Sequence, residues 1–235
     1  MAAGGLRIGA FAGAAIIVDW SVALLAGYII LSGLDEGGVR ALPAAFAFLA
    51  AILSAILIHE FGHAGVAAAL KLPSKRIVLS FMGGHVEFAH PPRTRWHDIA
   101  VSAAGPLANL ATAAVLFPLM PQFGALPPYV ALFFANLFVV SAFLGVLNLL
   151  PGFPLDGGRI LTALLSYWLH PLRARFISGI AGLLIAAAAA YWGYANQAWW
   201  TLGIAILLVL AAISEIRFTS AALRAPQGDG GRSNT

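Results

Sequence analysis

Two histidines of a type and spacing suited to metal binding stand in the segment His59-Glu60-Phe61-Gly62-His63. Residues four apart lie on one face of a helix, so two neutral imidazoles can occupy two corners of a tetrahedral zinc site. A glutamate beside the first histidine can hold a metal-bound water and remove its proton. The alternative is a pair of membrane histidines that only form hydrogen bonds to neighbouring helices. Glu60 would then be a buried acid without a role, so the spacing favours zinc-dependent hydrolysis.

The composition indicates where this chemistry takes place. Of 235 residues, 61% are hydrophobic and only 9% are charged, whereas about a quarter of the residues are charged in a typical soluble domain. The chain is therefore expected to be an integral membrane protein, and its net charge of +4 reflects membrane orientation rather than nucleic-acid binding. Cysteine is absent, which excludes disulfides and thiolate ligands. A zinc site must use His, Asp or Glu.

The elements that must position the motif are mostly apolar stretches long enough to cross a bilayer, which takes about 20 helical residues. We count about six, at residues 19–34, 43–70, 95–120, 128–150, 173–193 and 198–217. The sequence thus predicts an all-α polytopic membrane protein.

A small membrane-associated β element is predicted at residues 6–18 and 76–90. The first segment is expected to be a strand leading into the first helix, and the second a hairpin with Gly83-Gly84 at or near its bend. An open sheet edge cannot face lipid, so the hairpin is expected at the interface or packed on the helices. An ordinary cytosolic loop is the alternative for residues 76–90.

Lysine and arginine placement predicts the orientation. With a cytosolic N-terminus and six alternating helices, only Arg40 lies outside. The cytosolic residues are then Arg7, Lys71, Lys75, Arg76, Arg93, Arg95, Arg159, Arg173, Arg175, Arg217, Arg224 and Arg232. Both termini are therefore expected in the cytosol. His63 precedes the helix end near Lys71 by eight residues, which places it about 12 Å below the cytosolic surface.

A catalytic zinc site needs a third protein ligand and leaves one position for water. Most acids lie in an outside loop, at the C-terminus, near helix starts or in the hairpin: Asp35, Glu36, Glu215, Asp229, Asp19, Asp98 and Glu87. Asp156 remains, in a segment whose two prolines and three glycines break the fourth apolar stretch. Unwound backbone at membrane depth is tolerated where it lines a cavity. Asp156 is the predicted third ligand.

Two asparagines have open alternatives. The amide of Asn148 can stabilise the oxyanion that forms when water attacks a peptide carbonyl, or it can bond another helix. Asn109 follows the small residues of Gly105-Pro106-Leu107-Ala108, which permit close helix approach. It can fasten its helix to the histidine-bearing one or contact substrate, and packing is favoured. His85, His90, His97 and His170 lack partner spacing and are expected to be interfacial.

Together, His59 to His63, Gly105 to Asn109, and Asn148 through Asp156-Gly157-Gly158 resemble the site-2 protease family of intramembrane metalloproteases. The resemblance implies one catalytic zinc ion bound by His59, His63 and Asp156, with Glu60 as general base and acid. It implies Asn148 as an oxyanion or substrate contact. It further implies peptide hydrolysis in or near transmembrane segments of membrane-protein substrates, received in extended form by the hairpin at 76–90.

The domain prediction is one intramembrane metalloprotease domain over residues 1–220, with a catalytic core at about 43–170 and a flexible cytosolic tail at 221–235. The loop at 121–127 has no room for the PDZ domain of some relatives, and the CBS domain of others is lacking. Either the protein is a minimal member or the chain was trimmed. The expected location is a bacterial or archaeal inner or plasma membrane, with the active site near the cytosolic side.

A zinc-binding membrane transporter or channel is the alternative function, since broken helices and midplane polar residues also occur in transporters. Against it, no inverted repeat is found, and a transporter needs no glutamate beside its first ligand.

Overall fold

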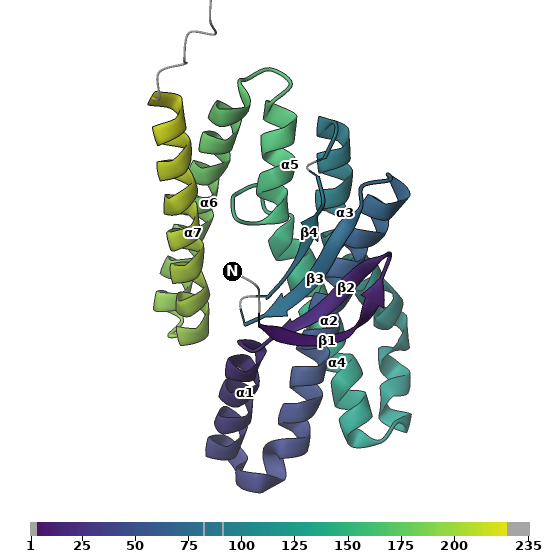
Figure 1. Ribbon diagram of the computed structural model, residues 1–235. Coiled ribbons are helices and arrows are strands. Elements are labelled where there is room, and N and C mark those ends of the chain that lie inside the picture. Colours follow the sequence, from purple (N-terminus) through teal and green to yellow (C-terminus); the bar gives the residue numbers. More distant parts are fainter. Residues whose placement is uncertain (1–3, 82, 91, 225–235) are drawn as a thin grey trace, which may run out of the picture. The chain divides into compact units, whose positions relative to one another are not determined.

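The computed structural model describes residues 4–81, 83–90 and 92–224 of the chain (Figure 1). These residues form two compact units that divide between Leu149 and Leu150. The fold is mostly helical with one small sheet, as the composition predicts. Each unit is described by itself below.

The N-terminal unit contains four long helices and two short 3-10 segments. Their bounds are α1 (Val22–Gly37), η1 (Gly38–Ala41), α2 (Leu42–Ala69), α3 (Arg95–Leu116), η2 (Phe117–Ala125) and α4 (Pro128–Asn148). Local signals explain the boundaries. Thr94 caps α3 by accepting a hydrogen bond from the backbone N–H of His97 at 3.1 Å. Helix α4 ends at Asn148, before the proline- and glycine-rich segment that was expected to break it.

The sheet of this unit has four strands in the order β1-β2-β3-β4. They are β1 (Gly5–Phe11), β2 (Ala14–Asp19), β3 (Ser74–Ser80) and β4 (Gly83–Phe88). The expected hairpin at 76–90 is confirmed as the antiparallel β3–β4 pair, and the alternative of an ordinary loop is wrong. The single strand expected at 6–18 is instead a second hairpin. Its turn, Ala12-Gly13, has positive φ at both residues, as a type I′ hairpin turn requires.

The sheet packs against helix α2 (Figure 1). Strands β2 and β3 pair in parallel, with Ile16 opposite Ile77. Both isoleucines are buried in one cluster with Ala14 and with Ala64 of α2. The apolar side chains of the central strands therefore attach the sheet to the helix that carries the histidines.

The C-terminal unit contains three helices: α5 (Asp156–Leu165), α6 (Pro171–Ala195) and α7 (Trp199–Arg224). Helix α5 is a separate short element that the count of apolar stretches did not include. Helices α6 and α7 are joined by an ion pair in which Arg175 donates to both carboxylate oxygens of Glu215, at 2.6 and 3.0 Å. Residues 221–224 of the predicted tail belong to α7, and the rest of that tail, 225–235, lies outside the described residues.

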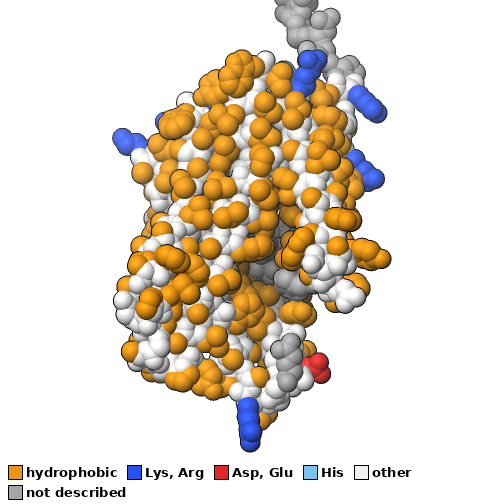
Figure 2. All heavy atoms as spheres, turned by 180° about the vertical axis from the view of Figure 1, so that it is seen from behind, with side chains coloured by type: hydrophobic (Ala, Val, Ile, Leu, Met, Phe, Trp, Pro, Cys, Tyr) orange, Lys and Arg blue, Asp and Glu red, His pale blue; other side chains and the backbone are white. Residues whose placement is uncertain are grey.

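Five helical segments are long and apolar enough to cross a membrane: Gly38–Ala69, Arg95–Ala125, Pro128–Asn148, Pro171–Ala195 and Thr201–Arg224. The remaining expected crossing corresponds to α1, whose apolar part, Val22–Asp35, is shorter. Figure 2 shows hydrophobic side chains covering most of one face of the molecule. Helices with so much apolar surface turned outward are suited to a lipid environment. The chain is therefore a multi-pass membrane protein.

Helices α2 and α3 approach each other closely through small residues. A Cβ on Gly62 would collide with the carbonyl oxygen of Ala104 and would lie 3.0 Å from the Cβ of Ala108. Small side chains at such contacts let two membrane helices pack backbone to backbone. This packing brings the side chains of α3 to the histidines of α2.

An ion pair outside the apolar helices predicts a pH effect on the β3–β4 hairpin. Arg76 Nε donates to Glu87 Oε2 at 2.7 Å, and this hydrogen bond lowers the pKa of Glu87 below its ordinary value of 4.5. A carboxyl group whose pKa is lower in the folded state stabilises the fold when the pH is above the ordinary pKa. This stabilisation is lost as the pH falls through the lowered pKa. Amide hydrogen exchange measures this effect, once the observed rates are divided by the intrinsic exchange rates at each pH. The backbone amides of β4 are then expected to be less protected at about pH 3 than at about pH 6. A Glu87→Gln variant should remove most of this pH difference.

Candidate metal centre

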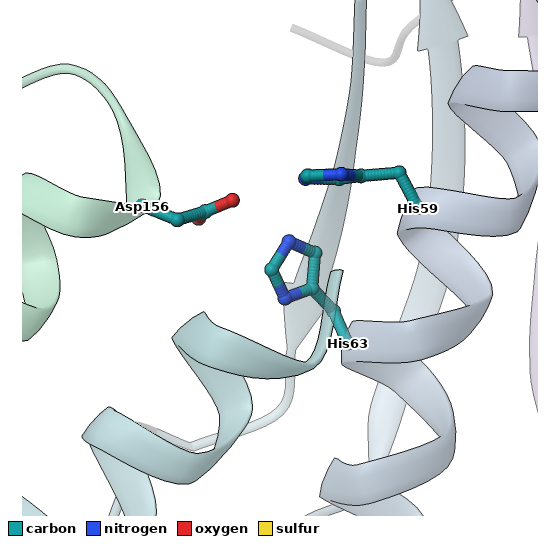
Figure 3. A group of neighbouring side chains, drawn as sticks. All are labelled: His59, His63 and Asp156. Atoms are coloured by element: carbon teal, nitrogen blue, oxygen red, sulfur yellow. The ribbon is translucent and has the colours of Figure 1, made fainter. Parts of the chain in front are cut away.

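The two histidines of the motif lie on one face of α2, as the four-residue spacing predicts. His59 is 7% and His63 is 6% exposed, although both belong to one of the most apolar helices of the chain. Their ring centroids are 4.7 Å apart, with the planes at 80°. Figure 3 shows the two rings projecting from α2 and Asp156 at the start of α5. Two imidazoles buried side by side in an apolar helix require polar partners.

Both rings find those partners on α3 through Nδ1. His63 Nδ1 lies 2.7 Å from the backbone oxygen of Val101. A carbonyl oxygen only accepts hydrogen bonds, so Nδ1 of His63 carries the proton and Nε2 carries the ring lone pair. His59 Nδ1 lies 3.2 Å from the side-chain amide of Asn109. The expectation that Asn109 fastens its helix to the histidine-bearing helix is therefore confirmed.

The two Nε2 atoms lie side by side against Gly105 of α3. A Cβ built on Gly105 would collide with Nε2 of His63 and would lie 2.8 Å from Nε2 of His59. Only glycine therefore lets α3 lie this close to both nitrogens. Two imidazole Nε2 atoms side by side, each ring bonded through its other nitrogen, is the arrangement of histidine ligands around zinc. The residues of this unit fit the metal that the motif predicts.

A side chain at Gly105 should weaken metal binding. We expect Gly105→Ala to lower zinc affinity by about tenfold or more, because the added methyl group would collide with Nε2 of His63 and crowd Nε2 of His59, which displaces both rings. Competition of the detergent-solubilised protein with a chromogenic chelator measures the change. Gly124→Ala is a matched control, since a Cβ at Gly124 meets nothing within 4 Å. Equal zinc affinity in the two variants would contradict this location of the site.

Glu60, the acid of the motif, is 3% exposed and lies against the β element. A Cβ on Gly84 would lie 2.5 Å from both Cγ and Oε1 of Glu60. Only a glycine fits between strand β4 and this carboxyl group. Gly84, predicted at or near the bend, lies within β4 opposite Leu79, where it lets β4 approach the acid of the motif.

Asp156 is the first residue of α5, in the C-terminal unit. The segment before it is held by α6. The backbone N–H of Phe153 donates to the carbonyl oxygen of Ser178 at 3.0 Å, and Ser178 Oγ donates to the carbonyl oxygen of Gly158 at 2.8 Å. A Cβ on Gly182 would collide with the carbonyl oxygen of Phe153. Sequence reasoning missed Ser178 and Gly182, and the small-residue run of α6 was the signal that could have located them.

The other polar residues singled out in the sequence have simpler surroundings. Asn148 donates from Nδ2 to the backbone oxygen of Leu144, one turn earlier in α4, at 3.0 Å. This Nδ2 hydrogen therefore bonds within α4 and not to another helix, which was one of the two alternatives for Asn148. Among the described residues, no other histidine belongs to a group of side chains that could hold a metal.

The fold and the donor residues define a class: a polytopic membrane protein that carries a metallopeptidase motif on a buried face of a membrane helix. Comparison with known proteins narrows the class. The sequence matches peptidase family M50 over residues 47–127 and 125–191. The chain belongs to this family, and the resemblance inferred from the motifs is confirmed.

Individual relatives agree with this assignment. The chain is 31% identical to sll0528 of Synechocystis over 169 residues, covering 68% of this chain and 44% of the relative. It is 31% identical to Rip3 of Mycobacterium tuberculosis over 170 residues, covering 68% and 43%. It is 33% identical to zinc metalloprotease MJ0392 of Methanocaldococcus jannaschii over 112 residues, covering 47% and 32%. The chain thus spans less than half the length of these relatives.

A solved structure shows the same fold. The site-2 protease from Methanocaldococcus jannaschii superimposes with a TM-score of 0.68 at 24% sequence identity. The match covers 91% of this chain and 95% of that chain. The arrangement of membrane helices and a small sheet is therefore that of a site-2 protease.

Proposed function

We propose that this protein is an intramembrane zinc metalloendopeptidase that hydrolyses peptide bonds in or near transmembrane segments of membrane proteins. The observation that carries the proposal is the pair of Nε2 atoms of His59 and His63 that lie side by side against Gly105, each ring bonded to α3 through its Nδ1. Glu60 is the next residue of the same apolar helix and is buried. Residues 1–220 would act as one functional domain.

His59, His63 and Asp156 are the proposed ligands of one zinc ion. Two neutral imidazoles and one carboxylate form a donor set typical of catalytic zinc and leave a position for water. The loop before Asp156 is bonded to α6 through Ser178, which would hold the carboxylate in a defined place. A zinc ion bound there would supply a Lewis acid that polarises the substrate carbonyl and lowers the pKa of water.

Glu60 is the proposed general base and acid. Its carboxylate would take a proton from the water whose oxygen attacks the scissile carbonyl carbon. As the C–N bond breaks, Glu60 would return that proton to the leaving nitrogen, so that one carboxyl group serves both halves of the hydrolysis. The second Nδ2 hydrogen of Asn148, which the bond to Leu144 leaves over, is the proposed donor to the developing oxyanion or to substrate.

The substrate is proposed to bind in extended form along β4. This strand ends the order of the described sheet, so one side of its backbone can pair with an added strand. Gly84 of β4 lies against the Glu60 carboxyl group. A peptide paired with β4 would thus pass close to the proposed base. Strand pairing also replaces the internal hydrogen bonds that a transmembrane helix loses when it unwinds.

Cysteine crosslinking can test this binding mode, because the natural chain contains no cysteine. His85 of β4 has a side chain that is 55% exposed. In a Glu60→Gln background, His85→Cys is expected to crosslink to single-cysteine reporter substrates at every second position near the cleavage site, as an extended strand requires. Val39→Cys in η1, 74% exposed, should give little product. A periodicity of three to four positions would show that the substrate stays helical.

The proposed orientation places both termini in the cytosol of a bacterial or archaeal cell, with the active site toward the cytosolic side. It is supported by the distribution of lysine and arginine, which leaves only Arg40 outside. Single cysteines introduced at Val39 and at Leu223, 42% exposed near the end of α7, should react with a membrane-impermeant thiol reagent from opposite sides. Labelling of both from one side would contradict the orientation.

The function itself is tested with purified protein in liposomes together with a membrane-spanning reporter. Cleavage is expected with zinc, is lost after chelation, and returns on zinc addition. Zinc flux without cleavage would instead identify a transporter.

A further inference from the structure

Asn109 is a side chain of α3 that bonds to a metal-motif histidine, whereas His63 is bonded to the backbone of Val101 on the same helix. It is fully buried, with an exposure of 0%. Its amide nitrogen Nδ2 lies 3.2 Å from His59 Nδ1, and its Oδ1 has no hydrogen-bond partner among the described residues. A buried amide oxygen without a partner is unusual and needs an explanation.

The orientation of the amide determines which nitrogen of His59 can bind a metal. If Nδ2 donates to Nδ1, the ring proton is on Nε2, and the nitrogen that lies against Gly105 has no lone pair for a metal. If the amide is turned by half a revolution, Oδ1 accepts a proton from Nδ1, and Nε2 becomes a ligand. The two orientations have nearly the same shape, so packing permits both.

We propose that Asn109 is a positioning residue that holds His59 in its metal-binding tautomer. Its Oδ1 accepts a hydrogen bond from Nδ1–H of His59, and this bond directs the Nε2 lone pair to the metal. The inference rests on the proposed function, because it takes His59 as a zinc ligand. It gives His59 the same arrangement that the carbonyl oxygen of Val101 gives His63. Both rings are then oriented from α3.

Such a partner strengthens metal binding, and its loss typically costs about 10- to 100-fold in affinity. Two substitutions separate hydrogen bonding from packing. Asn109→Leu keeps the size of the side chain but removes the acceptor, so its zinc affinity should fall by about 10- to 100-fold. Asn109→Asp keeps an acceptor at the same position, so its zinc affinity should stay at or above the wild-type value.

The experiment is zinc titration of the full-length protein in detergent against a competing chelator. Thr112→Ala is the matched control, because Thr112 is on the same helix and its hydroxyl donates to the Ala108 carbonyl oxygen at 2.9 Å, within α3. It should bind zinc as the wild type does. An Asn109→Leu affinity within threefold of wild type would overturn the proposal, as would equal losses in the leucine and aspartate variants.

A second readout reports the tautomer directly. Nitrogen NMR of the zinc-loaded protein with labelled histidine is expected to show a proton on Nδ1 of His59, assigned by comparison with a His59→Gln variant. A proton on Nε2 would contradict the role of Asn109. If the wild type binds no zinc at all, the proposed function fails. If it binds zinc but Asn109→Leu is unaffected, only the positioning role fails.

Discussion

Replacing Glu60 with glutamine is expected to abolish cleavage of a membrane-spanning reporter while zinc remains bound. The substitution keeps the shape of a side chain that is 3% exposed and lies against Gly84 of β4. It removes the group that takes and returns the proton. A positioned acid or base typically increases the reaction rate by about 10²- to 10⁴-fold. Because the variant loses both proton transfers, we expect its cleavage rate to fall by about 10⁴-fold or more. Cleavage is measured by gel in liposomes, and zinc by elemental analysis of the same sample.

A matched variant distinguishes chemistry from folding. Asp35→Asn makes the same acid-to-amide change at an exposed residue near the end of α1, and it should retain most of the cleavage activity. Rapid cleavage by the Glu60→Gln protein would remove Glu60 from the mechanism and with it the peptidase assignment. Loss of zinc together with activity would indicate instead that Glu60 supports the metal site.

Replacing Asp156 with alanine is expected to lower zinc affinity by several orders of magnitude, to less than one bound ion per chain at micromolar zinc. Two neutral imidazoles remain in that variant, and they provide neither the third donor nor the negative charge that stabilises a buried dication. The measurement is metal content after dialysis, run beside the cleavage assay. Asp35→Ala, at an exposed aspartate near the end of α1, should bind zinc normally.

Asp156 is the one proposed ligand that belongs to the C-terminal unit, whereas both histidines belong to the N-terminal unit. Wild-type zinc content in Asp156→Ala would show that another group completes the site. The loop that carries Asp156 should then be dispensable as well, and Gly182→Val, which would displace Phe153, should also keep its zinc.

Several elements could be predicted from the sequence because their causes are local. The length and apolar composition of α2, α3, α4, α6 and α7 indicate membrane helices without knowledge of their neighbours. The four-residue spacing of His59 and His63 places both rings on one face of any helix. The prolines and glycines after Asn148 end α4 through their own backbone properties.

Other features were missed because their local signal is weak or because their causes lie elsewhere in the chain. The hairpin formed by β1 and β2 was expected as one strand, since its two-residue turn includes Ala12, an unusual residue at positive φ. Helix α5 is too short to stand out in a hydropathy pattern. Gly105 and Gly84 looked like packing and turn residues, and only contacts with α2 show that one faces the histidines and the other faces Glu60.

The sequence by itself determined the chemistry that is available: a membrane protein without thiols, with His59, Glu60 and His63 on one helix face. Residue type and helical period are properties of the chain alone, so no tertiary contact was needed for that conclusion. The tertiary structure decided how those side chains are directed. Small residues bring α3 against α2, and this contact places Val101 and Asn109 on the Nδ1 atoms. Helix packing therefore brings both Nε2 atoms side by side against Gly105.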